Sequence, residues 1–278
     1  MLGRTLRQRL TGHELHVADL PEWDVTNGED FARRLCGVAP DAVIHCAAMT
    51  KVDDCEAKRD LAFRLNETGS RNVALACKAC GARLIAISTD YVFSGDPPSE
   101  PWAWSETDAP NPHTVYGESK LAGERQVLAL CPGSSVVMRI AWLYGAGGPS
   151  FVHTMAKLGA QKGGAPLKVV DDQRGNPTST VAVAEAVKFL LARPEATGVV
   201  HATCEGEATW YGLALELKRL LGDRFPREIV PCATAEFPRP APRPRNSSLD
   251  KGVLRAMGFR MPGWRDALAG FVADEFNQ

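Results

Sequence analysis

Short, continuously apolar runs alternate with longer amphipathic segments through the first two thirds of the chain. Runs that are apolar at every position are typical of strands in a parallel sheet, because both faces of such a sheet are covered. Strands that alternate with helices in this way predict an α/β fold built on a doubly wound parallel sheet. The expected strands are 14–19, 42–46, 83–88, 135–140 and 199–202, and the expected helices are 28–35, 57–80, 116–130, 151–162 and 181–191.

The pattern changes after Gly198, where regular segments become sparse. Helices are expected over 211–221 and 263–276, and the segment 225–244 between them contains six prolines. We therefore expect a sheet-bearing domain and a smaller carboxyl-terminal lobe built over the carboxyl ends of the strands, where open α/β sheets bind their ligands. The domain should comprise residues 1–145, with 179–204 returning to it, and the lobe 146–178 and 205–278.

Charge and composition narrow the class of partner. The 278 residues carry 32 Lys and Arg against 33 Asp and Glu, so the formal net charge is −1. This balance disfavours nucleic acid or an anionic membrane as the main partner. The longest apolar helix-like stretch, 181–192, is interrupted by Glu185 and Lys188, and residues 1–10 lack the apolar core of a secretory signal. We expect a cytoplasmic protein.

Eight cysteines are spread through the expected helices and strands. Cys77 and Cys80 form a C-x-x-C pair, but no second pair completes a zinc site. Both lie on the apolar face of an expected helix, and free cysteine packs as a small hydrophobic residue. We expect buried free thiols and no metal site.

Tyr116 and Lys120 stand four residues apart at the start of an expected helix. Residues at this spacing share one helical face, so the phenol and the ammonium can point into one cleft. A tyrosine has a pKa near 10, and a nearby ammonium stabilises the phenolate and brings that pKa towards neutrality. The pair is therefore a candidate for general acid–base chemistry.

Two hydroxyls, Ser88 and Thr89, follow the expected strand 83–88. A hydroxyl just beyond a parallel strand lies at the ligand-binding edge of the sheet, where it can hydrogen-bond a substrate carbonyl oxygen. Taken without Tyr116, these residues are equally typical of an ordinary turn.

The combination of a hydroxyl with Tyr-x-x-x-Lys on a doubly wound sheet resembles the extended short-chain dehydrogenase/reductases, and in particular the dTDP-4-dehydrorhamnose reductases. The resemblance extends over nearly the whole chain and implies a Rossmann-type dinucleotide-binding domain and a substrate-binding lobe. The matching segments are 45–53, 88–93, 111–112, 116–120, 139–145, 170–173, 175–178 and 243–250.

The resemblance implies reduction of the 4-keto group of a dTDP-linked deoxysugar by NADPH or NADH. Tyr116 would protonate the alkoxide, Lys120 would hold the nicotinamide ribose and acidify Tyr116, and Thr89 would hydrogen-bond the keto oxygen. The implied substrate is dTDP-4-dehydro-6-deoxy-L-mannose, and a homodimer is a possible assembly.

The resemblance also implies binding residues. Those on the cofactor side are Gly3, Asp19, Asp24, Val25, Ala47, Ala48, Thr50 and Asn66, together with Tyr116 and Lys120. Those on the substrate side are Val52, Tyr91, Trp142, Arg245 and Asn246. Trp142 is also compatible with a core aromatic. An acidic residue at the end of a strand, here Asp19, hydrogen-bonds the adenosine ribose and favours NADH, although the family uses both cofactors.

The start of the chain departs from the family. Gly3 matches the last glycine of the family's phosphate-binding turn, but no strand or earlier glycine precedes it. A strand and turn amount to about ten residues. We expect either that the native chain begins upstream of Met1 or that tight cofactor binding has been lost.

Two other functions share this fold. Sugar-nucleotide dehydratases resemble this chain but place a second carboxylate after the aspartate, where this chain has Tyr91 after Asp90. The beta subunit of methionine adenosyltransferase also resembles these reductases, so a non-catalytic regulatory subunit remains the alternative. Tight cofactor binding without turnover would favour it.

Overall fold

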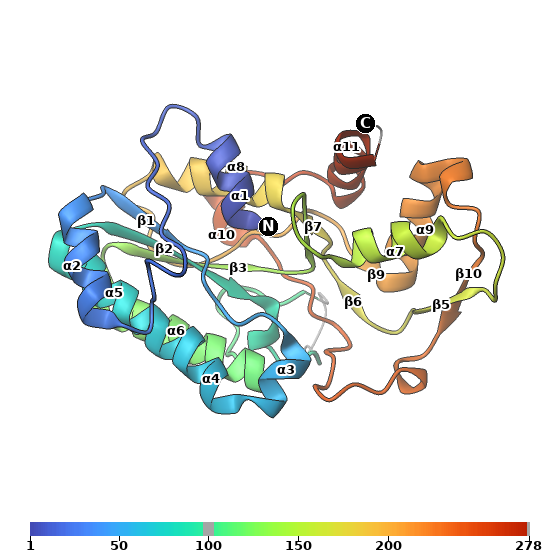
Figure 1. Cartoon of the computed structure of the whole chain (residues 1–278), viewed down its shortest axis with the longest axis horizontal. Helices are drawn as coiled ribbons and strands as arrows, with labels where there is room; N and C mark the ends of the chain where they lie inside the picture. Colours follow the sequence, from blue (N-terminus) through green and yellow to red (C-terminus); the bar gives the residue numbers. More distant parts are fainter. Residues whose placement is uncertain (97–102, 277–278) are drawn as a thin grey trace.

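A parallel sheet forms the centre of the larger part of the molecule (Figure 1). The computed structural model describes residues 1–96 and 103–276. In the described part the sheet has the order β1-β2-β3-β8, and each neighbouring pair is parallel. Its strands are β1 (Ala42–His45), β2 (Arg83–Thr89), β3 (Ser135–Ile140) and β8 (Gly198–His201). The expected strands 42–46, 83–88, 135–140 and 199–202 are confirmed within a residue or two.

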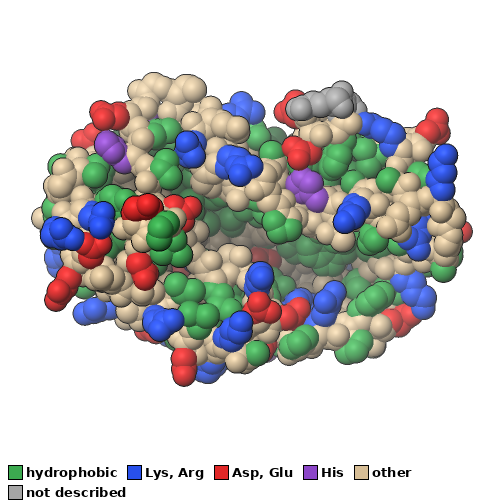
Figure 2. All heavy atoms as spheres, viewed as in Figure 1, with side chains coloured by type: hydrophobic (Ala, Val, Ile, Leu, Met, Phe, Trp, Pro, Cys, Tyr) green, Lys and Arg blue, Asp and Glu red, His purple; other side chains and the backbone are tan. Residues whose placement is uncertain are grey.

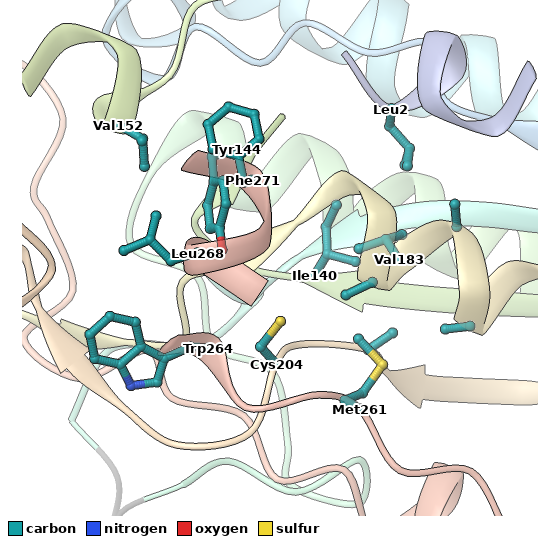
Figure 3. Packing of buried hydrophobic residues seen from close by; sticks show 14 of the residues in the cluster. Leu2, Ile140, Tyr144, Val152, Val183, Cys204, Met261, Trp264, Leu268 and Phe271 are labelled. Carbon is teal, nitrogen blue, oxygen red and sulfur yellow. The ribbon is translucent and has the colours of Figure 1, made fainter. Parts of the chain in front are cut away.

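Helices cover the sheet on each side. Successive strand residues contribute to different apolar clusters: Ile85 and Val136 to one, Leu84 and Val137 to the other. The first cluster includes helices α1 and α8, and Figure 3 shows Leu2 and Val183 from them close to Ile140. The second cluster includes α2 and α5 and the end of α6. The bounds are α1 (Leu2–Arg9), α2 (Gly28–Val38), α5 (Gly69–Cys80), α6 (Val115–Leu130) and α8 (Thr180–Leu191). The doubly wound arrangement is confirmed.

The strand expected over 14–19 does not form. All residues from 11 to 20 are exposed, and Leu15 and Val17 keep 41% and 52% of their surfaces accessible. A strand exists through hydrogen bonds to a neighbour, and none of the described ladders includes this segment. Strand β1 is accordingly the edge of the described sheet.

The single helix expected over 57–80 is four consecutive pieces. Non-helical backbone at Lys58 (φ −129°, ψ 51°) separates α3 (Val52–Ala57) from α4 (Arg59–Phe63), and a π-helical turn at Arg64–Thr68 leads into α5. Single π-helical turns occur frequently at functional sites. This one carries Asn66, which is fully buried.

The elements that lie beside the sheet in Figure 1, which include α7, α9, β5 and β10, are called the smaller lobe; the bounds expected for it stay a prediction. Leu213 of α9 and Leu268 of α11 belong to the same apolar cluster as α1 and α8. Strand β10 lies within the proline-rich stretch and was not expected; it pairs with β5 alone, so Pro231 sits on an edge where its missing N–H is tolerated. The remaining elements are β4 (Leu143–Tyr144), α7 (Phe151–Gly159), β5 (Leu167–Val170), β6 (Arg174–Gly175), β7 (Thr178–Ser179), β9 (Ala208–Thr209), α9 (Trp210–Leu221), β10 (Ile229–Cys232), α10 (Gly252–Ala256) and α11 (Trp264–Phe276).

The eight cysteines are free thiols; the expected burial holds for five of them, whereas Cys46 and Cys80 are partly buried and Cys36 is exposed. Burial raises the pKa of Cys77 to about 12, which makes it unreactive at neutral pH. Among the described residues, no helix combines the length and apolar character required to cross a membrane.

Candidate active site

Helix α6 begins against the loop that follows β2. Thr114 caps the helix by accepting a hydrogen bond from the Gly117 N–H at 3.0 Å, and its own residue type is a favoured N-cap. Gly117 permits a close approach, because a Cβ there would lie 2.1 Å from the Tyr91 carbonyl oxygen. These two contacts bring the first turn of α6 against the carboxyl end of β2.

Tyr116 and Thr89 meet at this junction. Burial raises the pKa of the Tyr116 phenol, and a hydrogen bond with the Thr89 hydroxyl opposes the rise. The rings of Tyr91 and Tyr116 lie 5.6 Å apart in an edge-to-face arrangement. The phenol is therefore protonated at neutral pH, which is the form that a proton donor requires.

Lys120 lies one turn further along α6 and is buried. Its Nζ donates to the Ile87 carbonyl oxygen at 2.7 Å. Burial lowers the pKa of Lys120 to about 8, while the Glu124 carboxylate opposes this shift. The acidification of Tyr116 by this ammonium stays a prediction; in the structure the amine is directed to the strand carbonyl.

Ala47, Ala48 and Thr50 lie in the loop that leaves the carboxyl end of β1. Asn66 secures this loop: its Oδ1 accepts from the Met49 N–H at 2.8 Å, and its Nδ2 donates to the Met49 carbonyl at 3.1 Å. Ala47 and Thr50 remain exposed. The loop thus presents backbone groups and a hydroxyl at the strand ends, next to β2.

Four of the expected cofactor-side residues precede this loop in the chain: Gly3, Asp19, Asp24 and Val25. The hydrogen bonds of the last three join them to residues outside the loop. Asp19 accepts from the Leu20 N–H within its own turn, and hydrogen bonds from Thr26 lower the pKa of Asp24. Val25 is held through its carbonyl, which accepts from Asn72. A Cβ on Gly3 would meet nothing within 4 Å, so close packing does not account for a glycine there. Their cofactor contacts stay predictions.

A cavity of about 190 Å³ opens beside Tyr91, between the loop after β2 and the proline-rich segment of the smaller lobe. Arg243 and the exposed Arg245 line it. The Arg243 guanidinium pairs with Asp53 of α3 at 2.8 Å, which ties the lobe to the sheet-bearing part. Figure 2 shows that the molecule is hollowed near the middle of this view, with apolar side chains deep in the hollow.

Two further substrate-side residues take different positions. Val52 packs in the same apolar cluster as Tyr91 and Tyr116. Asn246 is buried and does not line the cavity; its Oδ1 accepts from the Ser248 N–H at 2.9 Å, and its carbonyl oxygen accepts from Trp104. Asn246 thus shapes the loop that presents Arg245.

Trp142 follows β3 with a left-handed backbone (φ 46°), which is rare for a large residue and occurs often at functional sites. Its ring stacks on Trp210 with centroids 3.5 Å apart and 2° between the planes. The Trp210 Nε1 in turn donates to the Gln173 side chain at 3.0 Å. The half-buried stack is compatible with a wall of a sugar pocket.

Several functional candidates were missed by reasoning from sequence. Trp210 occurs in a segment without a distinguishing local pattern, whereas Asp53 and Arg243 lie in the matching segments 45–53 and 243–250 but were assigned no role. Asp90 is fully buried, and burial raises its pKa to about 6; its place after Thr89 was the only available signal. Their roles depend on partners distant along the chain.

The donors and acceptors at the strand ends fit one half of a nicotinamide dinucleotide. The exposed loop after β1 and the Lys120 amine suit a ribose, which is recognised by hydrogen bonds to its hydroxyls. A doubly wound parallel sheet carrying a hydroxyl, a tyrosine and a lysine at its carboxyl edge defines the class: this is a Rossmann-type oxidoreductase of the short-chain dehydrogenase/reductase kind.

Comparison with known proteins agrees. The family model described as the RmlD substrate binding domain matches residues 1–276. A dTDP-4-dehydrorhamnose reductase of Streptomyces griseus is 41% identical over 96% of this chain and 88% of its own length. A probable dTDP-4,6-dihydroxy-2-methyloxan-3-one 4-ketoreductase of Streptomyces antibioticus is 42% identical over 96% of this chain and 90% of its own length.

A solved dTDP-4-dehydrorhamnose reductase of Bacillus anthracis, in complex with NADP, superposes with a TM-score of 0.92. It is 36% identical, and the match covers 98% of this chain and 95% of that one. The chain belongs to the dTDP-4-dehydrorhamnose reductase family.

Proposed function

We propose that this protein reduces the 4-keto group of dTDP-4-dehydro-6-deoxy-L-mannose to give dTDP-L-rhamnose, with NADPH or NADH as the reductant and Tyr116 as the proton donor. Relatives at about 40% identity that carry the reductase name support the substrate class. The B. anthracis complex with NADP supports the cofactor class. A reduced nicotinamide dinucleotide, when bound, supplies the hydride.

The observation that carries the proposal is the buried, protonated Tyr116 in the first turn of α6, placed by the close approach of Gly117 to the Tyr91 carbonyl against the end of β2 that bears Thr89. Hydride addition to a ketone leaves negative charge on the carbonyl oxygen, and that oxygen must then gain a proton. Thr89 donates a hydrogen bond to it, and the phenol of Tyr116 donates the proton. Lys120, held by the Ile87 carbonyl oxygen, fixes a positive charge one turn away.

The smaller lobe supplies the remaining specificity. Arg245, exposed at the cavity rim, suits the diphosphate of a nucleotide sugar, because a guanidinium offers several donors to phosphate oxygens. Tyr91 and the Trp142–Trp210 stack offer ring surfaces against which a deoxysugar can pack. The apolar faces of these rings exclude water from the reacting carbonyl.

The test is oxidation of NADPH and of NADH in the presence of the keto-sugar nucleotide, followed optically, with chromatographic identification of dTDP-L-rhamnose. Tyr116→Phe should lower turnover by at least about 100-fold, the usual contribution of a positioned acid. Tyr144→Phe is the matched control, because its buried hydroxyl has no hydrogen-bond partner among the described residues. Unchanged turnover in Tyr116→Phe would remove Tyr116 from the mechanism.

The same assay separates the alternatives. Cofactor binding without turnover of any dTDP-linked keto sugar would favour the non-catalytic regulatory subunit. Turnover of a different dTDP-4-keto sugar in preference would keep the reaction class and change the substrate. The ratio of kcat/KM for NADPH and NADH decides the cofactor.

A further inference from the structure

A buried ion pair lies one helical turn beyond Lys120. Glu124 and Arg139 each expose 3% of their side chains, which is unusual for charged residues. The guanidinium holds the carboxylate with two nitrogens: Nη2 donates to Oε2 at 2.7 Å, and Nε donates to Oε1 at 3.0 Å. The Ser88 hydroxyl also donates to Oε1. Three donors fix the position of this carboxylate.

The surroundings of Arg139 keep its charge directed at Glu124. Its Nη1 lies 3.4 Å from His201 Nε2, and its guanidinium lies 5.1 Å from the ring centroid of Phe93. His201 Nδ1 is 2.8 Å from the Asp250 carbonyl oxygen, so Nδ1 carries the proton and Nε2 accepts from Arg139. Burial lowers the pKa of His201 to about 3, which leaves the ring neutral.

Glu124 and Lys120 face one small internal cavity between α6 and β2, and Arg139 does not line it. Two consecutive residues of β2 hydrogen-bond to these side chains. The Ile87 carbonyl oxygen accepts from the Lys120 amine, and the Ser88 hydroxyl donates to the Glu124 carboxylate. The carboxylate and the buried amine therefore line the same cavity, and the carboxylate opposes the lowering of the Lys120 pKa by burial.

The other titratable groups that face Lys120 carry no charge at neutral pH. Burial lowers the pKa of His45, the last residue of β1, to about 3 and raises that of Cys46, which follows it, to about 12, so both side chains are neutral. Tyr116, on the same helix, is a protonated phenol. Glu124 is thus the counter-charge available to a buried ammonium that burial itself disfavours.

We propose that Glu124 is a positioning residue for the proposed reductase reaction: its carboxylate, fixed by Arg139 and Ser88, keeps Lys120 in the ammonium form at neutral pH. The role in turnover rests on the proposed function, whereas the effect on Lys120 is a property of this chain alone. The Glu124–Arg139 ion pair also joins α6 to β3. The experiments must therefore distinguish the proposed role from a purely structural one.

The first test measures Lys120 directly. In protein labelled with ¹³C at lysine Cε, the Lys120 signal is identified by its loss in Lys120→Met, and its chemical shift is followed against pH. Glu124→Gln should move the Lys120 titration downward by about 1 pH unit, since an opposite charge nearby shifts a pKa by about 1–3 units. Glu124→Asp should restore part of the shift. An unchanged titration in Glu124→Gln overturns the proposal.

The second test uses turnover, with Val127→Ala as the control, because Val127 is buried on the same helix and carries no charge. Glu124→Gln should lower activity about tenfold more at pH 9 than at pH 6.5, relative to the native chain. Val127→Ala should lower the stability of the protein and leave the fall in turnover between pH 6.5 and pH 9 as it is in the native chain. Equal losses at both pH values would assign the pair a structural role only.

If Glu124→Gln alone fails to fold, because it leaves Arg139 buried and unpaired, the double variant Glu124→Gln/Arg139→Gln removes both charges. Its Lys120 titration should also move downward, and an unmoved titration overturns the proposal. Should the native chain turn over no keto sugar, the proposed function fails while the titration still decides the part assigned to Glu124.

Discussion

Asn66 holds the loop that follows β1, and its replacement should loosen that loop by a calculable amount. The residue is fully buried and makes three hydrogen bonds: one from the Met49 N–H at 2.8 Å, one to the Met49 carbonyl at 3.1 Å, and one to the Ser119 hydroxyl at 2.9 Å. Asn66→Ala removes all three and leaves the two Met49 backbone groups without this partner.

The expected cost follows from these contacts. A hydrogen bond contributes about 1 kcal/mol to stability, so Asn66→Ala should lower the free energy of unfolding by about 3 kcal/mol. Asn72 is the matched control on the next turns of the chain, because its side chain is also buried but makes one hydrogen bond, to the Val25 carbonyl at 2.9 Å. Asn72→Ala should cost about 1 kcal/mol.

Urea unfolding followed by tryptophan fluorescence measures the free energy of unfolding of both variants. The comparison requires that this free energy depend on urea concentration with the same slope in each variant. Asn66→Ala should also raise the KM for the dinucleotide, because Ala47, Ala48 and Thr50 flank Met49 in the loop, whereas Asn72→Ala should leave it near the native value. The reasoning is refuted if Asn66→Ala destabilises the protein no more than Asn72→Ala does.

Three further outcomes are expected. Gly123→Ala should destabilise by about 2 kcal/mol, because its Cβ would lie 2.3 Å from the Asn66 carbonyl oxygen, while Gly133→Ala, with nothing within 4 Å, should be neutral or stabilising in the same urea titration. Turnover should fall above about pH 8, because Lys120 loses its proton there while the raised pKa of the phenol keeps Tyr116 protonated. A turnover rate that does not change up to pH 10 would contradict this. Trp142→Ala should raise the KM for the sugar nucleotide more than about tenfold, because it removes the stacked ring, and should leave dinucleotide binding unchanged. A lower melting temperature with an unchanged KM would assign Trp142 to the core.

The central strands and their helices were predictable because their signals are local. Four of the six residues at 135–140 are apolar, and all six are buried in β3. Tyr116 and Lys120 could likewise be placed on one face of a helix from their spacing. The segment 14–19 carries the same kind of signal and yet forms no strand, since a strand also requires a neighbour to pair with.

The polar interior was not predictable. Glu124 and Arg139 are 15 residues apart in sequence and form a buried pair, although charged residues in helices and strands are usually exposed. Trp210 stacks on Trp142 from the smaller lobe, and nothing around Trp210 in the sequence indicates this. The acidification of Tyr116 by Lys120 was expected from their spacing and stays a prediction, whereas the hydrogen bond from the amine to the Ile87 carbonyl oxygen gave no signal in the sequence.

The amino-acid sequence by itself determined the α/β class, the order of the central elements and the tyrosine–lysine pair, because periodicity and spacing act over a few neighbouring residues. Tertiary structure alone decided which polar groups are buried and what each one meets there. Burial sets the charge state of Tyr116, Lys120 and Asp90, and it arises only when elements distant along the chain pack together.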